Sequence, residues 1–176
     1  MIQTKNIALI GMPGSSKTTT GKMLAEKLNR EFIDTDIVYE EKYGETIAAT
    51  FAKYGEEVFR KRETEVFKVC MQKSAAIIAT GGGIVLKQEN RSILKEGQVV
   101  WLQASLDTIF ERVKNDKTRP LLEGLKKERI TQLYQERKEL YAEAADIVTV
   151  TDGKITEQIA DEICAKLVDL SLSKLI

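Results

Sequence analysis

The segment Gly11-Met12-Pro13-Gly14-Ser15-Ser16-Lys17-Thr18 decides the fold of this 176-residue chain. An apolar run at residues 7–10 precedes it and an amphipathic segment at residues 18–28 follows it, which is the strand, glycine-rich loop and helix order of a P-loop. In such a loop successive backbone N–H groups turn inward, and the free N–H groups of the following helix add positive partial charge. The segment therefore predicts a phosphate site in which Lys17 reaches the outer phosphates and the Thr18 hydroxyl ligates Mg²⁺.

Ser16 departs from the usual pattern G-x-x-x-x-G-K-[ST], because it stands where the second glycine belongs. That glycine usually has a positive φ, where a residue with a Cβ costs about 1–2 kcal/mol. A cost of this size would weaken nucleotide binding about tenfold without abolishing the site. The alternative is an ordinary Gly/Ser turn before a helix, which would make Lys17, Thr18 and both flanks accidental.

Composition favours one domain spanning residues 1–176, with 27 basic and 27 acidic residues. This balance provides no global field for nucleic acid or an anionic membrane, so we expect neither partner. The chain has no His, so a carboxylate or water must handle any proton transfer. Cys70 and Cys164 are expected to be buried thiols rather than a disulfide or a metal pair. With no apolar run of about 20 residues and a first strand close to Met1, we expect a cytoplasmic protein. We also expect a monomer.

Short apolar runs alternate with longer helical patterns along the chain, which predicts an α/β, doubly wound sheet of about five parallel strands with helices on both faces. The expected strands are residues 6–10, 32–35, 75–79, 98–102 and 146–150. The expected helices are residues 17–28, 40–73 with breaks near Gly44 and Gly55, 88–95, 106–114, 126–145 and 156–170. Ligands in such folds bind at the carboxyl ends of the strands, so residues 11–17, 34–36 and 81–83 should face one another.

Two of these strand ends carry weak signals of their own. Asp34 and Asp36 place two carboxylates one residue apart, where one could hold Mg²⁺ through water and the other could face a substrate hydroxyl. The alternative is a helix N-cap, a role that Asp36 could also fill. Three successive glycines, Gly81 to Gly83, indicate a close approach of the backbone to a ligand, or else a tight turn.

Three further features are ambiguous taken singly. The polar segment 115–124, which contains Arg119, is either a mobile lid or a plain surface loop. Arg60 and Arg137 lie on predicted helices and have the planar fork that suits a carboxylate, but a solvated surface charge is the usual role of such a residue. For Arg60, residues Val58, Phe59, Val66, Val69 and Cys70 are expected to form the apolar face of the helix.

The ordered set of motifs G-M-P-G-S-S-K-T-T-T-G-K, F-I-D-T-D, G-E-E-V-F-R, A-T-G-G-G, T-R-P-L-L and Q-E-R-K-E-L-Y resembles the shikimate kinase family, a branch of P-loop kinases. The resemblance covers residues 7 to about 150. It implies transfer of the γ-phosphoryl group of ATP to the 3-hydroxyl of shikimate, with Mg²⁺ as cofactor. It also implies a substrate-binding helical region at residues 36–73 and a lid at residues 115–124.

The resemblance further implies roles for individual residues. The implied catalytic residues are Lys17, Asp36 and Arg119, and the implied metal site is Thr18 with Asp34 through water. ATP would be bound by Gly11, Gly14, Ser15, Ser16, Lys17, Thr18, Thr19, Arg112 and Arg119. Shikimate would be bound by Asp36, Arg60, Gly81, Gly82, Gly83 and Arg137. Residues 152–154 fall where the family often has an adenine-side loop.

The sequence leaves two alternative functions open. One is another small-molecule P-loop kinase, of the gluconate or nucleotide type. The other is a catalytically weakened nucleotide-binding module, which Ser16 would favour.

Overall fold

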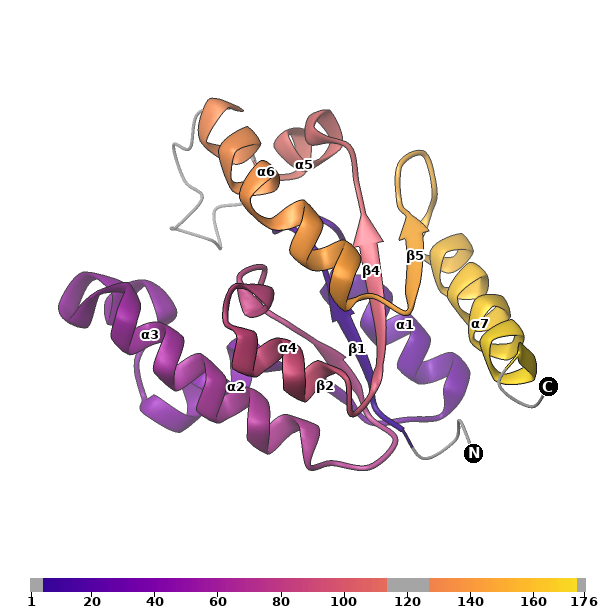
Figure 1. The fold of residues 1–176 in the computed structure, drawn as a ribbon, viewed down its shortest axis with the longest axis horizontal. Coiled ribbons are helices and arrows are strands. Elements are labelled where there is room, and N and C mark those ends of the chain that lie inside the picture. Colours follow the sequence, from indigo (N-terminus) through magenta and orange to yellow (C-terminus); the bar gives the residue numbers. More distant parts are fainter. Residues whose placement is uncertain (1–4, 114–126, 174–176) are drawn as a thin grey trace.

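The computed structural model describes residues 5–113 and 127–173, and five parallel strands form its central sheet in the order β2-β3-β1-β4-β5 (Figure 1). The strands are β1 (Ile7–Ile10), β2 (Phe32–Asp34), β3 (Ile77–Ala79), β4 (Gln98–Gln103) and β5 (Ile147–Val150). β1 lies at the centre, with Ile7 opposite both Ile77 of β3 and Gln98 of β4. The predicted five-stranded parallel sheet is confirmed, and each strand lies within a residue or two of its predicted position.

Helices occupy the connections between these strands. They are α1 (Lys17–Leu28), α2 (Thr35–Tyr43), α3 (Ile47–Met71), α4 (Gln88–Leu94), α5 (Leu106–Val113), α6 (Lys127–Ala144) and α7 (Thr156–Ser173), with a short 3-10 helix, η2 (Ile84–Leu86). The predicted start of the second helix at residue 40 is wrong, because α2 begins directly after β2. Asp34 is its N-cap and accepts a hydrogen bond from the Asp36 backbone N–H, so Asp34 rather than Asp36 caps this helix.

The two faces of the sheet bury separate apolar clusters, because successive strand residues point to opposite sides. Ile7 and Leu9 pack with α1 and α7, whereas Ala8 and Ile10 pack with α2, α3, α4 and α6. Figure 1 shows α3, α4 and α6 in front of the sheet and α1 behind it. Burial on both faces explains why the strands are continuous apolar runs rather than alternating ones.

The 25-residue helix α3 contains a kink at Gly55, where φ is 82° and ψ is 177°. Both breaks predicted in this region are confirmed, since Gly44 ends α2 with φ 66°. One detail is wrong: Val69 is exposed, and Phe67 takes its expected place in the core. Cys70 is buried and Cys164 half-buried, and both are free thiols.

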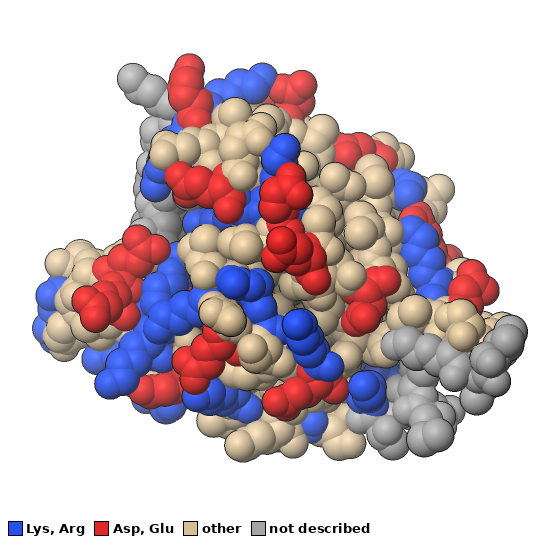
Figure 2. All heavy atoms as spheres, viewed as in Figure 1, with Lys and Arg blue, Asp and Glu red and all other residues tan. Residues whose placement is uncertain are grey.

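The surface is mixed in charge. Figure 2 shows basic and acidic side chains intermixed over one face of the molecule, in keeping with the equal numbers of the two in the sequence. Among residues 5–113 and 127–173, no helix is both long and apolar enough to cross a lipid bilayer.

Gly21 fixes how closely α1 approaches the sheet. A Cβ at this position would lie 2.5 Å from Cε2 of Phe32 and 3.1 Å from Cδ1 of Leu9. We expect Gly21→Ala to lower the free energy of unfolding by about 1–3 kcal/mol, because overpacking outweighs the gain in helix propensity of about 1 kcal/mol. Urea denaturation would measure this change, with Lys22→Ala at the adjacent exposed position as the control. A Gly21→Ala protein as stable as the parent would contradict the close packing of α1.

Candidate active site

The loop between β1 and α1 has the backbone conformation that the sequence predicts for a phosphate-binding loop. Gly11 has φ 145° and Gly14 has φ 80°, both in the region that favours glycine. A Cβ at Gly11 would lie 2.5 Å from the carbonyl oxygen of Leu102, so the loop turns hard against the end of β4. The glycines at residues 11 and 14 thus both have physical reasons, although the motif itself requires only the first of them.

Ser16 adopts the left-handed conformation, with φ 70° and ψ 23°. The backbone therefore keeps the shape that the motif requires, and the Cβ of Ser16 is accommodated in a strained loop rather than by a shifted one. Ser16 is also the N-cap of α1, but its side chain makes no capping hydrogen bond. No cap compensates for the cost of its left-handed φ.

The side chain of Lys17 lies inside the loop. Its ammonium group donates hydrogen bonds of 2.8 Å to the carbonyl oxygens of Gly11 and Met12, and the residue is only 6% exposed. These two carbonyl partners orient the Lys17 ammonium group toward the loop. Nearby, Ser15 is buried, and its hydroxyl has no hydrogen-bond partner among the described residues.

Thr18 and Asp34 bring two oxygen ligands together at the ends of neighbouring elements. The Thr18 hydroxyl donates a hydrogen bond of 2.9 Å to Oδ2 of Asp34, whose Oδ1 accepts from the Asp36 backbone N–H at 3.0 Å. Hydroxyl and carboxylate oxygens suit Mg²⁺, which takes few protein ligands and keeps waters or phosphate oxygens for the rest. No group of three or more His, Cys, Asp or Glu able to hold a metal occurs in the described part of the chain. The pair therefore fits a metal that is shared with phosphates.

A cavity of about 620 Å³ opens beside the P-loop. It is lined by Pro13 of that loop and by six residues that the resemblance assigned to the acceptor, namely Asp36, Arg60, Gly81, Gly82, Gly83 and Arg137. Asp34 lines it as well. The expectation that the carboxyl ends of β1, β2 and β3 face one another is confirmed.

The glycine triplet forms one wall of this cavity, and each glycine is needed for a different neighbour. A Cβ at Gly81 would lie 2.9 Å from Oε1 of Glu63, and one at Gly82 would lie 2.7 Å from Cδ of Pro13. A Cβ at Gly83 would collide with the Arg60 guanidinium group. None of the three has a positive φ, so close approach, rather than conformational freedom, explains the triplet.

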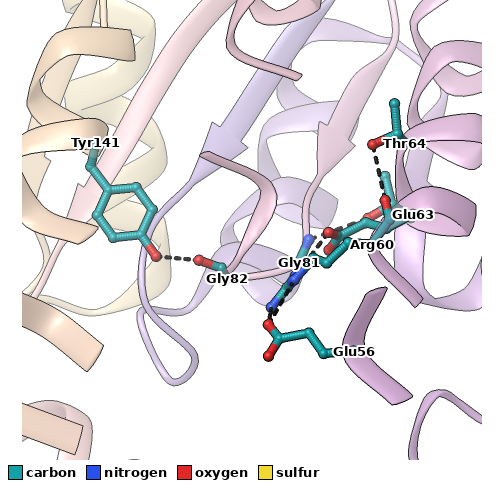
Figure 3. Close-up of polar contacts among 8 residues, drawn as sticks. Glu56, Arg60, Glu63, Thr64, Gly81, Gly82 and Tyr141 are labelled. Carbon is teal, nitrogen blue, oxygen red and sulfur yellow. Dashed lines mark hydrogen bonds and ion pairs between the residues drawn. The ribbon is translucent and has the colours of Figure 1, made fainter. Parts of the chain in front are cut away.

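Arg60 lies in α3 between two carboxylates, as Figure 3 shows. Its guanidinium group donates to Glu63 at 2.8 Å and to Glu56 at 3.1 Å, and it lies over the Phe59 ring. Arg137 enters the cavity from α6; it is 8% exposed, and its Nε has no hydrogen-bond partner in the part of the chain that the structure describes. Both arginines thus point into the cavity rather than into solvent, contrary to the usual role of a helical Arg.

Glu63 is a cavity residue that the sequence analysis missed. It is buried beside Gly81 and Arg60, and burial raises its pKa although Arg60 and Arg137 act in the opposite direction. Its spacing of three residues from Arg60 places both on one helix face, and this spacing was the available sequence signal. Helical i,i+3 charge pairs are common on surfaces, so the signal did not mark a buried site.

Tyr141 of α6 fixes the other side of the glycine triplet. Its hydroxyl donates a hydrogen bond to the Gly82 carbonyl oxygen (Figure 3). Its ring stacks on Trp101, with the ring centroids 5.7 Å apart. Burial raises the pKa of Tyr141 to about 12, so the phenol keeps its proton and remains a donor. The sequence motif containing this tyrosine did not reveal that role.

Arg112 lies in the last turn of α5 and contacts the P-loop. It donates to the Gly14 carbonyl oxygen at 3.1 Å and to the Thr151 hydroxyl at 3.3 Å. Asp152, which follows Thr151 in the chain, accepts hydrogen bonds from the backbone N–H and the hydroxyl of Ser105. Arg112 thus connects the P-loop to Thr151, the residue directly before the segment 152–154. Arg119 and the whole segment predicted as a lid, residues 115–124, lie outside the described residues.

The raised pKa of Glu63 predicts a pH dependence of stability. The folded protein holds this proton above the ordinary value of 4.5, so the contribution of Glu63 is complete at low pH and is lost as pH rises through the folded-state pKa. We therefore expect Glu63→Gln to gain stability relative to the parent as pH rises from about 4 to about 8. Urea denaturation of both proteins across that range would measure the difference. A difference that stays constant with pH would contradict a raised pKa.

Comparison with known proteins agrees with this geometry. The family model described as "Shikimate kinase" matches residues 13–168. The shikimate kinase of Francisella tularensis subsp. novicida (strain U112) is 45% identical over 172 residues, which is 96% of this chain and 98% of that protein. The structure of shikimate kinase from Acinetobacter baumannii in complex with shikimate has a TM-score of 0.92 at 37% identity, covering 97% of each chain.

A more distant likeness concerns the fold alone. A gluconokinase from Sinorhizobium meliloti has a TM-score of 0.67 with 13% identity, over 99% of this chain and 98% of that chain. The P-loop kinase architecture is shared with that enzyme, whereas the sequence and the family model are not those of a gluconokinase. The chain belongs to the shikimate kinase family.

Proposed function

We propose that this protein transfers the γ-phosphoryl group of ATP to the 3-hydroxyl of shikimate, and that the cavity beside the P-loop holds the acceptor. One observation carries the proposal: Pro13 of the P-loop, the carboxylates Asp34 and Asp36, and the arginines Arg60 and Arg137 are all among the residues that line a single cavity. Its volume of about 620 Å³ falls in the range of small-molecule sites. A coupled assay of ADP release with and without shikimate tests the reaction.

Shikimate carries one carboxylate and several hydroxyls, and the cavity offers partners for both. Arg60 and Arg137 would bind the carboxylate, with each hydrogen bond to a charged group contributing about 1.5–3 kcal/mol. Glu56 and Glu63 would hold Arg60 in place while it binds. Asp36 and the glycine triplet would face the ring and its hydroxyls.

Thr18 would ligate Mg²⁺ directly, and Asp34 would hold it through water. The cation, when bound, supplies positive charge that neutralises the phosphate oxygens. The contact between Thr18 and Asp34 supports this assignment, because it places the two oxygen atoms 2.9 Å apart.

The remaining work is positioning and charge stabilisation, as in phosphoryl transfer generally. Lys17 would exchange its carbonyl partners for phosphate oxygens and neutralise the charge that develops during transfer. Asp36 would orient the attacking hydroxyl and accept its proton, so the absence of His is no obstacle.

Other assignments belong to the same proposal. The loop residues Gly11, Gly14, Ser15 and Ser16, together with Thr19 in the first turn of α1, would bind ATP through their backbone N–H groups. Arg112 would flank the adenine, which its contact with Gly14 supports. Arg119 would meet the transferring phosphoryl group from a lid at residues 115–124, and residues 36–73 would form the acceptor-binding region. We expect a cytoplasmic monomer.

A panel of acceptors separates this proposal from its rivals. With ATP as donor, the parent should phosphorylate shikimate and leave gluconate and nucleoside monophosphates unmodified. Phosphorylation of either of those, with none of shikimate, would overturn the acceptor assignment. A folded parent that phosphorylates nothing, and stays inactive after Ser16→Gly, would favour a nucleotide-binding module.

Ser16→Gly tests the cost of the left-handed serine. Removing the Cβ should lower the KM for ATP about tenfold or somewhat more, because the strain at this position is about 1–2 kcal/mol, and should leave the KM for shikimate nearly unchanged. Initial rates at varied ATP and varied shikimate measure both constants. An unchanged KM for ATP with a higher melting temperature would show that the strain burdens folding rather than binding.

Lys17→Met and Asp36→Asn test the proposed mechanism. Each should reduce kcat by at least about a hundredfold, because each removes a group that acts on the reacting atoms. The dissociation constants of ATP and shikimate, measured by calorimetry, should change much less. Full activity of Asp36→Asn would remove this carboxylate from the mechanism, and Lys22→Met is a matched control at an exposed position of α1.

A further inference from the structure

The helix α6 presents a second arginine to the acceptor cavity. Arg129, Leu133 and Arg137 all line the cavity, and their spacing of four residues places them on one stripe of the helix. At 1.5 Å per residue, the two arginines are about 12 Å apart along the axis. Arg137 is buried, whereas Arg129 is exposed at the mouth.

The charges that line the cavity are divided between its walls. Asp34, Asp36 and Glu40 lie at the end of β2 and on α2, whereas the two α6 residues of the lining that carry charge are both arginines. In total five carboxylates line the cavity against three guanidinium groups, an excess of two negative charges when all the carboxylates are ionised. An acceptor that is itself an anion is therefore repelled by the excess of carboxylates unless it approaches along the α6 wall, which is formed by Arg129, Leu133 and Arg137.

Positive charge on the α6 wall is not compensated by nearby carboxylates. Arg60 has ion pairs to both Glu56 and Glu63. Within residues 5–113 and 127–173, neither Arg129 nor Arg137 lies within salt-bridge distance of a carboxylate. Arg129 Nη1 instead donates to Gln132 Oε1 at 2.9 Å, which orients its guanidinium group without neutralising it.

Helix stability does not account for Arg129. It lies in the first turn of α6, which begins at Lys127, and the positive end of the helix dipole disfavours a cation there. The same dipole adds to the positive potential at the cavity mouth. A basic residue at this position therefore favours the binding of an anion but does not stabilise the helix.

We propose that Arg129 is a specificity residue: it attracts the acceptor carboxylate to the mouth of the cavity, and Arg137 then binds that carboxylate inside. This inference rests on the proposed function, since it takes shikimate as the acceptor. Arg129 acts before the chemical step, so it governs association and kcat/KM rather than kcat. Because it acts through solvent, its effect falls with ionic strength, as the Debye length shrinks from about 30 Å at 0.01 M to about 3 Å at 1 M.

Steady-state kinetics of Arg129→Gln tests the proposal. We expect kcat/KM for shikimate to fall about three- to tenfold at low salt, with kcat and the KM for ATP unchanged, and the loss to vanish near 1 M salt. Arg129→Lys should remain close to the parent. Lys138→Gln is the matched control, because it removes the same charge from the same helix outside the cavity lining.

A binding measurement separates this inference from the reaction itself. The fluorescence of Trp101, which stacks on Tyr141 beside the glycine triplet, can follow shikimate association by stopped flow without turnover. If the parent binds shikimate but is inactive, slower association in Arg129→Gln would support the role of Arg129 and contradict the proposed reaction. Parent-like kcat/KM at low salt, a loss independent of salt, a loss in kcat, or an equal loss in Lys138→Gln would each overturn the role of Arg129. A parent that neither binds nor phosphorylates shikimate would end both.

Discussion

The site depends on how closely other elements approach the backbone of residues 81–83. A Cβ on any of these three glycines would collide with a neighbouring residue, namely Glu63, Pro13 of the P-loop or Arg60. Tyr141 then binds the carbonyl oxygen of the middle glycine from α6. One short segment after β3 thus sets the distances between the phosphate loop, α3 and α6. Side chains on these glycines would separate the groups that handle phosphate from those that face the acceptor.

The P-loop shows how a motif can survive a substitution that its pattern forbids. Backbone geometry in this loop is dictated by the end of β1, the start of α1 and the burial of Lys17 against two loop carbonyl groups. Those constraints together outweigh about 1–2 kcal/mol of strain at one residue, so Ser16 takes the φ that a glycine would take.

Most of the fold was predictable because the chain follows local rules. Buried parallel strands are apolar throughout, and glycines end or break the helices where they were expected, at Gly44 and Gly55. The start of α2 could not be predicted, because an aspartate that caps a helix cannot be told from a metal-site aspartate in the sequence. Asp34 has the geometry of a helix cap, and its Oδ2 still lies beside the Thr18 hydroxyl, where it can take part in a metal site. Glu63 and Arg129 were missed for a related reason. Charged residues on a helix usually face water, and only the tertiary arrangement of α3 and α6 turns these two toward the cavity.

The kink at Gly55 separates two parts of α3 that differ in how much of the core they carry. Before it, Ile47 and Phe51 line the cavity and are only partly buried against the core. After it, Arg60 and Glu63 line the cavity, while Val66 and Phe67 on the same straight segment are fully part of the core. A substitution or a change of tilt in the second part therefore affects cavity and core together, whereas the first part can change with less loss of packing. Acceptor preference can for this reason diverge during evolution more readily through residues 47–54 than through the segment after the kink.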